Sequence, residues 1–185
     1  PEGVGVRPDG REVWVTGETD HDVTIIGTDS GRVLGHIVVD KRPRGVAFAP
    51  DGRTAYVSAE VGGTLSIVDV ATRTVTTVIR MPEGARPMGI AVSPDGGRVY
   101  VTTGRGGTVV VVDAAARRIT GSVAVGPRPW GVALTPDGRR LYTANGPSND
   151  VSVVSTETMQ VLKRIPVGKM PWGVAIGSVP SPAAR

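Results

Sequence analysis

One sequence motif, Pro-x-Gly, recurs along the chain at nearly constant spacing, and this periodicity constrains the fold more than any other feature. The motif begins at Pro1, Pro43, Pro87, Pro129 and Pro171, which are 42, 44, 42 and 42 residues apart. Four complete units therefore span residues 1–42, 43–86, 87–128 and 129–170, and residues 171–177 repeat only the opening of a unit. Units of this length are single supersecondary structures that bury their apolar faces against their neighbours.

Each unit contains four short runs of β-branched and aromatic residues separated by turn residues. In the first unit the runs are GVGV, EVWVT, DVTIIG and RVLGHIVV. A Pro-Asp-Gly turn follows the first run of every unit, where proline presets φ and glycine tolerates a positive φ. One slot of the second run is always aromatic: Trp14, Tyr56, Tyr100 and Tyr142. Tandem four-stranded antiparallel units of about 40 residues predict an all-β fold, a β-propeller of four blades followed by one orphan strand.

The repeated pattern P-x-G-V-A-x-x-P-D-G-x-x-x-Y-V-T, followed by V-x-V-V-D, resembles the YVTN-type β-propeller repeat. The stretches PEGVGVRPDG, SAEVGGTLSIVDVATR, LYTANGPSNDVSVV and VGKMPWGVAIG are similar to the closing half of propellers associated with pyrroloquinoline-quinone-dependent catabolism. The tetrapeptide itself departs from the pattern, as WVTG, YVSA, YVTT and YTAN. The resemblance implies a ring of about seven blades, and a bacterial protein exported to the periplasm or the extracellular space.

The fragment at residues 171–177 predicts that the ring is closed by strands from elsewhere. It is the first strand of a blade without the three that normally follow, and an unpaired strand would leave amides and carbonyls bare. We expect the chain to be the C-terminal part of a longer propeller, whose other blades precede it in the same protein. The alternative is a half-ring completed by a second subunit. Residues 178–185, rich in Pro, Ser and Ala, are expected to form a flexible tail.

Composition excludes several classes of protein. The 185 residues include no cysteine, so disulfides, thiolate metal sites and a cysteine nucleophile are excluded. No apolar run approaches the roughly 18 residues of a membrane span. The 21 basic and 17 acidic residues give a net charge of +4, but no continuous basic stripe carries stacking aromatics, so we expect no nucleic-acid partner. Only His21 and His36 are available, no catalytic or metal-binding motif is present, and no cofactor is expected.

The loops that precede each Pro-x-Gly motif carry the candidate binding residues. Propeller strands run outward from the channel, which places these loops at the channel mouth and the Pro-Asp-Gly turns on the opposite face. The candidates are the basic and flat side chains Arg42, Arg44, Arg86, Met88, Arg128, Trp130, Lys169 and Trp172. Cations beside aromatic rings can hold an anionic or aromatic ligand, or the acidic surface of a protein. Alternatively, the large side chains pack blade against blade while the arginines are solvated or bind loop carbonyls.

Two classes of function follow from this sequence. The lack of a catalytic cluster favours a non-enzymatic binding or scaffold propeller, whose partner at the mouth is a protein or a small ligand, and which is accessory to an exported oxidoreductase. The alternative is an enzyme or cofactor carrier of the lyase or redox type, whose catalytic groups lie in blades that this chain does not contain.

Overall fold

The computed structural model describes residues 1–177, and it confirms the predicted all-β architecture of four antiparallel four-stranded sheets. The first blade contains β1 (Val4–Val6), β2 (Glu12–Gly17), β3 (Asp22–Gly27) and β4 (Val33–Val38). The second contains β5 (Pro43–Phe48), β6 (Thr54–Ala59), β7 (Thr64–Asp69) and β8 (Thr74–Arg80). The third contains β9 (Ile90–Val92), β10 (Arg98–Thr102), β11 (Thr108–Asp113) and β12 (Arg118–Ala124). The fourth contains β13 (Pro129–Leu134), β14 (Arg140–Asn145), β15 (Asp150–Ser155) and β16 (Gln160–Pro166).

Helix is almost absent from the part of the chain that the structure describes. Within residues 1–177 it is limited to one 3₁₀ turn, η1 (Gly104–Gly106). No helix there is long and apolar enough to span a membrane. The tail predicted for residues 178–185 lies outside the described residues.

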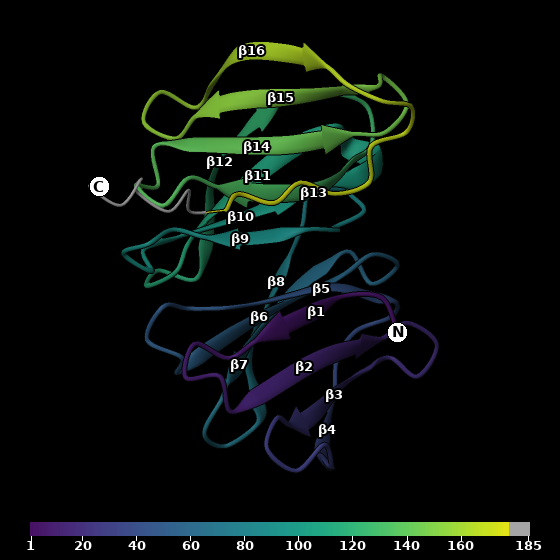
Figure 1. The fold of residues 1–185 in the computed structure, drawn as a ribbon, viewed down its shortest axis with the longest axis vertical. Coiled ribbons are helices and arrows are strands. Elements are labelled where there is room, and N and C mark those ends of the chain that lie inside the picture. The colour runs from purple at the N-terminus through teal and green to yellow at the C-terminus, as the bar shows by residue number, and fades with distance from the viewer. Residues whose placement is uncertain (178–185) are drawn as a thin grey trace, which may run out of the picture.

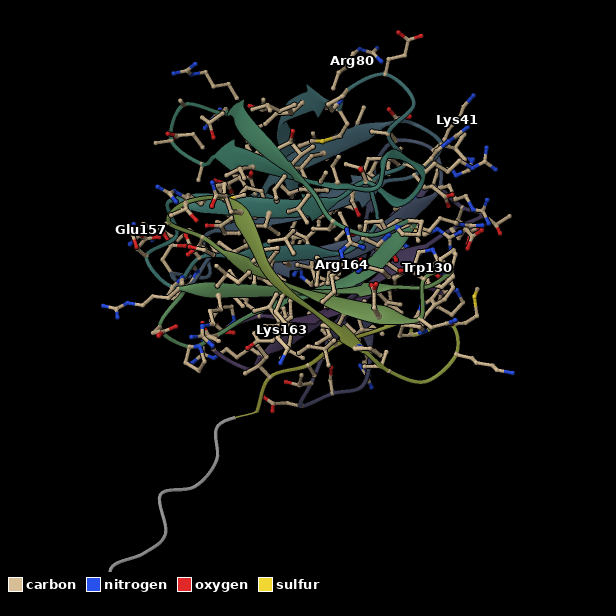
Figure 2. The ribbon with its side chains drawn as sticks, turned by 90° about the horizontal axis from the view of Figure 1, so that it is seen from above. Lys41, Arg80, Trp130, Glu157, Lys163 and Arg164 are labelled. Carbon is tan, nitrogen blue, oxygen red and sulfur yellow. The ribbon has the colours of Figure 1, made fainter. Side chains whose placement is uncertain are left out.

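The blades follow one another in chain order around a common axis (Figure 1). Their innermost strands, β1, β5, β9 and β13, contact one another in that order, and each sheet runs outward from its inner strand to its outer one. The loops before the inner strands lie at one end of the blades, and the Pro-Asp-Gly turns lie at the other. Figure 2 shows Lys41 and Trp130 on the first side, which we call the mouth face. Glu157 lies on the opposite side, which we call the turn face.

Neighbouring blades pack through the aromatic slot that the repeat predicted. Trp14 is fully buried and meets the edge of Phe48 in the next blade at a centroid distance of 5.0 Å. Tyr56 and Tyr100 are also buried, each within the apolar cluster that joins its blade to the following one. Edge-to-face aromatic contacts and large buried rings dominate the packing energy of cores of this kind.

The glycine of Pro-x-Gly allows adjacent inner strands to approach closely. A Cβ on Gly45 would lie 2.6 Å from the carbonyl oxygen of Met88, and one on Gly89 would lie 2.6 Å from that of Trp130. No other residue fits so near a neighbouring backbone. The Ser58 hydroxyl donates to the same Met88 carbonyl at 2.5 Å. The junction between neighbouring blades is therefore hydrogen-bonded as well as packed.

Residues 171–177 run beside β13 without joining a sheet (Figure 1). A Cβ on Gly131 would come within 2.7 Å of the Gly173 Cα, so the segment occupies the place that the inner strand of a next blade would take. Thr102 of the third blade donates to the Trp130 carbonyl at 3.0 Å, but its equivalent in the fourth blade is Ala144, which has no hydroxyl. The pairing of residues 171–177 with strands from elsewhere stays a prediction.

Candidate functional site

The mouth face holds a cavity of about 380 Å³ between the inner strands. Its wall is formed largely by the middle residue of each Pro-x-Gly motif, which is the one position of the motif that varies. These residues are Glu2, Arg44, Met88, Trp130 and Trp172. The backbone of the repeat therefore fixes where each side chain lies, and the variable position decides the chemistry.

One half of the mouth is a network of ion pairs. The Arg44 guanidinium contacts Glu60 at 2.7 Å, Glu18 at 3.1 Å and Glu2 at 2.6 Å. Arg42 contacts Glu18 at 2.5 Å and Glu60 at 3.4 Å. Burial by itself lowers the pKa of Arg44, but the hydrogen bond and charge of Glu60, with the charges of Glu2 and Glu18, more than offset it and leave the pKa raised. With three carboxylates around two guanidinium groups, this half carries one net negative charge.

The other half of the mouth is apolar and aromatic. Met88 and Trp130 are buried, whereas Trp172 is 57% exposed. The slot that carries Glu18 and Glu60 in the first two blades is occupied by Gly104 and Gly146 in the last two. A Cβ on Gly146 would fall directly on the Trp130 indole, and one on Gly104 would lie 3.2 Å from Met88 Cγ. The small residues thus make room for the large ones.

Trp130 lies between a cation and a second indole. The Arg128 guanidinium carbon is 5.3 Å from the centroid of the Trp130 ring, within cation–π range. The Trp172 ring stacks against Trp130 with centroids 4.3 Å apart. Because Trp130 is covered by these neighbours, Trp172 is the aromatic side chain that presents most of its surface to the mouth.

The candidate residues share the mouth face but divide into different environments. Arg42 and Arg44 are ion-paired, which the sequence analysis did not foresee. Arg86, Arg128 and Lys169 have no ion-pair partner among residues 1–177.

The glutamates that complete the network were absent from the predicted site. Glu18 and Glu60 each lie four residues after the aromatic slot, so the register of the repeat contained the signal that would have placed them beside the arginines. Glu2 occupies the variable position of the first Pro-x-Gly motif, where the same signal applied.

The two histidines have structural partners. His36, on the outermost strand β4, contacts Asp22 at 2.8 Å. His21, at φ 59°, accepts a hydrogen bond from the Arg42 amide through Nδ1 at 3.2 Å. Within residues 1–177 no group of three His, Asp or Glu side chains is arranged to hold a metal ion.

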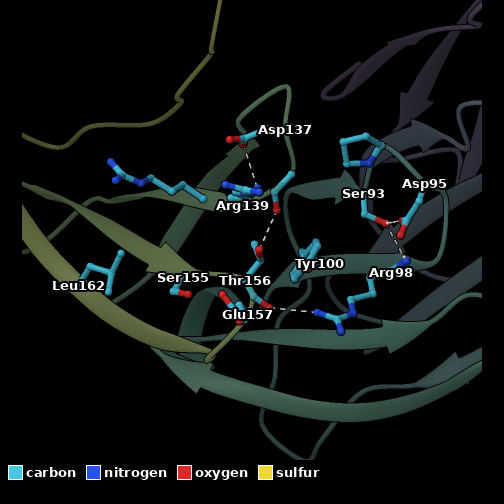
Figure 3. A pocket seen from close by; sticks show the side chains of 13 residues that line it. Ser93, Asp95, Arg98, Tyr100, Asp137, Arg139, Ser155, Thr156, Glu157 and Leu162 are labelled. Atoms are coloured by element: carbon cyan, nitrogen blue, oxygen red, sulfur yellow. Dashed lines mark hydrogen bonds between the residues drawn. The ribbon is translucent and has the colours of Figure 1, made fainter.

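A further cavity, of about 800 Å³, opens on the turn face between the third and fourth blades (Figure 3). Arg98 and Tyr100 line it from the third blade, and Arg139 and Thr156 line it from the fourth. The repeat pattern predicted only turns on this face.

Comparisons with known proteins agree with the fold. A family model described as lactonase, 7-bladed beta-propeller, matches residues 34–166. The Kuenenia stuttgartiensis hydrazine synthase structure aligns with a TM-score of 0.84 and 24% identity over 89% of this chain. A functionally unknown protein from Desulfotomaculum acetoxidans DSM 771 aligns with a TM-score of 0.82 and 20% identity over 94% of this chain. The chain spans 48% and 58% of those two chains, and no curated protein matches it.

Proposed function

The chain belongs to the lactonase family of seven-bladed β-propellers, and we propose that it is a binding propeller whose channel mouth takes a small planar anion. The observation that carries this proposal is the division of the mouth cavity into an apolar aromatic wall and a charged wall. Ligand sites commonly combine apolar surface with a few polar groups that fix orientation.

The aromatic wall supplies the contact surface for the ligand. Trp172 is exposed and already rests on Trp130, so a planar ring stacked on Trp172 would extend an existing stack rather than order a mobile side chain. Arg86, Arg128 and Lys169 lie on this face, outside the lining of the cavity, and have no acidic partner in the described residues, so they favour an anionic substituent on the ligand. Arg42 and Arg44 are paired with three carboxylates, so the opposite wall is net negative and directs the anionic group of the ligand away from it.

The proposal can be tested with 1-naphthoate as a planar anionic probe and 1-naphthalenemethanol as its neutral counterpart. We expect naphthoate to bind more tightly in calorimetry, and Trp172→Ala to weaken it about three- to tenfold, the value of one aromatic contact. Trp14→Phe, at a residue that is buried between blades and does not line the mouth cavity, is the matched control. If Trp172→Ala and Trp14→Phe bind naphthoate equally, the mouth is not the site, and a protein partner on this face becomes the better explanation.

A second candidate function is suggested by the family description, lactone hydrolysis. The mouth supplies three carboxylates, Glu2, Glu18 and Glu60, and an ionised carboxylate can act as the general base for an attacking water. Release of acid from a panel of five- and six-membered lactones, followed in a pH-stat, tests this. Activity that is lost in Glu2→Gln but kept in Trp172→Ala would favour the hydrolase over the binding propeller.

We further propose that the protein acts in the periplasm or outside the cell, next to an oxidoreductase, and that blades from the same protein or a second subunit complete its ring. The seven-bladed family supports the need for further blades. Cell fractionation and co-purification of the native protein test location and partner together, because a partner captured only from cytoplasmic extract would contradict both.

A further inference from the structure

The cavity on the turn face can be compared with an equivalent groove, which the repeat places between the second and third blades. That groove measures about 360 Å³, less than half of the 800 Å³ between the third and fourth blades. Where the smaller groove has Thr54 and Ala115, the larger one has Arg98 and Glu157. The two grooves therefore share a backbone design but differ in the chemistry of their lining.

The slot at the start of the second strand changes its chemistry from blade to blade. In the first blade it is Glu12, which accepts hydrogen bonds from Trp14 Nε1 at 2.9 Å and from Arg73 at 3.1 Å. The Trp14 indole N–H and the Arg73 guanidinium therefore both have an acceptor in the first blade. In the third and fourth blades the same slot holds Arg98 and Arg140, which can only donate.

This exchange leaves polar groups free in the larger groove. Arg98 uses one nitrogen, Nη1, to bond the Thr156 carbonyl at 3.0 Å (Figure 3). Arg98, Arg139 and Arg140 have no ion-pair partner within residues 1–177. Tyr100 is 1% exposed and lines the cavity. Among residues 1–177 the buried side-chain polar atom without a hydrogen-bond partner is Arg7 Nε, so the Tyr100 hydroxyl is not sealed in the core and is open to a ligand in the cavity.

The carboxylates of the groove either accept hydrogen bonds within the turns or lie at the rim. Asp95 accepts from the Ser93 hydroxyl at 2.5 Å, and Asp137 accepts from the Thr135 hydroxyl at 2.5 Å and from the Arg139 amide at 3.0 Å. Both therefore shape the Pro-Asp-Gly turns, and these hydrogen bonds lower the pKa of each. The remaining carboxylate, Glu157, is exposed at the rim of the groove.

We propose that the groove between the third and fourth blades is a second binding site, for a small hydroxylated molecule carrying a phosphate or carboxylate group. Guanidinium groups bind such oxyanions through paired, charge-assisted hydrogen bonds, and Arg98, Arg139 and Arg140 supply them. The hydroxyls of Tyr100 and Ser155 bind the hydroxyl groups of the ligand. The site lies on the face opposite Trp130, so it operates independently of the mouth (Figure 2).

The probes for the test are inorganic phosphate, succinate and glycerol 3-phosphate, titrated into the intact protein and followed by backbone amide chemical shifts. We expect saturable shifts at Gly138 and Thr156, with glycerol 3-phosphate binding more tightly than inorganic phosphate. The preference for phosphate or succinate identifies the oxyanion. Absence of saturable shifts at the groove up to about 50 mM of every probe would overturn the proposal.

Single substitutions test the contribution of each side chain of the proposed site. Arg98→Thr, which restores the residue of the second blade, should weaken all three probes about tenfold, the loss of one charge-assisted pair. Arg140→Thr provides an independent check if Arg98→Thr disturbs folding. Arg53→Thr, in the second blade, is the matched control and should bind normally. If Arg98→Thr and Arg53→Thr bind the probes alike, the groove is not the site.

Tyr100→Phe tests the hydroxyl, and it should remove the advantage of glycerol 3-phosphate over phosphate. Because Trp172→Ala leaves this groove intact, failure of the mouth proposal is recognised separately.

Discussion

The indole rings of Trp130 and Trp172 stack with their centroids 4.3 Å apart and their planes inclined by 34°. This contact joins β13 to residues 171–177, which form no backbone hydrogen bond to the rest of the described chain. The segment is therefore held by side-chain stacking and by its close approach to Gly131. An aromatic contact, in place of a strand ladder, connects the last inner segment to the fourth blade.

Replacing Trp172 by alanine should lower the free energy of unfolding by about 0.5–1.5 kcal/mol, the usual value of an aromatic pair beyond its buried area. Trp172→Phe keeps a ring in the stack and should retain most of the stability. Denaturant unfolding measures both variants. Equal losses in the two would mean that the stack contributes nothing specific.

Gly146 is required by the indole that lies over it. A Cβ at this position would overlap the Trp130 ring, so Gly146→Ala should displace the indole and destabilise the fold by about 1–3 kcal/mol, as overpacking does. Gly168→Ala is the control, because a Cβ there meets no atom within 4 Å. Thermal unfolding and the tryptophan fluorescence maximum, to which Trp130 contributes together with Trp14 and Trp172, report the change; an unshifted spectrum in Gly146→Ala would contradict a displaced indole.

Ala144 occupies the slot from which the other blades donate a hydroxyl to the next inner strand. Ala144→Ser should add a hydrogen bond to the Trp172 carbonyl and raise the free energy of unfolding by about 0.5–1.5 kcal/mol. The reverse change, Ser58→Ala, should cost a similar amount, because the Met88 carbonyl then loses its buried donor. The two effects are compared by denaturant unfolding, and a destabilised Ala144→Ser would show that the slot has no room for the oxygen.

Arg44 contacts every carboxylate of the ion-pair network in the charged half of the mouth. Its side chain is 11% exposed and contacts three carboxylates, so Arg44→Met leaves these carboxylates with a single cation and should destabilise the protein by roughly 2–4 kcal/mol. Lys41→Met removes an exposed cation from the same loop and should cost less than about 0.5 kcal/mol. Similar melting temperatures for the two variants would argue that the network is not structural.

Asp95 and Asp137 make stability sensitive to acid. Hydrogen bonds from Ser93 and Thr135, the largest causes, lower their folded-state pKa values below the unfolded value of about 3.9. A depressed folded-state pKa stabilises the fold above the unfolded value, and this contribution is lost as the pH falls through the folded-state value. The double variant Asp95→Asn, Asp137→Asn should lose less of its melting temperature than the natural protein as the pH falls below about 4. An unchanged acid profile would exclude these two groups as its cause.

Much of the fold could be read from periodicity. The spacing of Pro-x-Gly, the Pro-Asp-Gly turns and the aromatic slot placed four blades in register, because each of these features solves a local problem of backbone geometry or packing that recurs in every blade. The same register predicted Met88 and Trp130 for the loops of one face, and both line the mouth cavity, while their role in binding stays a prediction. It also contained the positions of Glu18 and Glu60, although their role becomes evident only beside Arg44.

The blade, its turns and the faces on which its loops lie could be predicted from the repeat, since these depend on contacts within about 42 residues of chain. Which charges cancel and which cavities open became evident in the folded molecule. Arg44 meets Glu2 and Glu18 across a blade junction, and Arg98 reaches Thr156 across another. Such contacts depend on how far side chains reach between neighbouring sheets. The repeat pattern describes one blade, whereas an ion pair or a cavity between blades is formed by side chains of two blades. Its formation therefore depends on how the two blades pack.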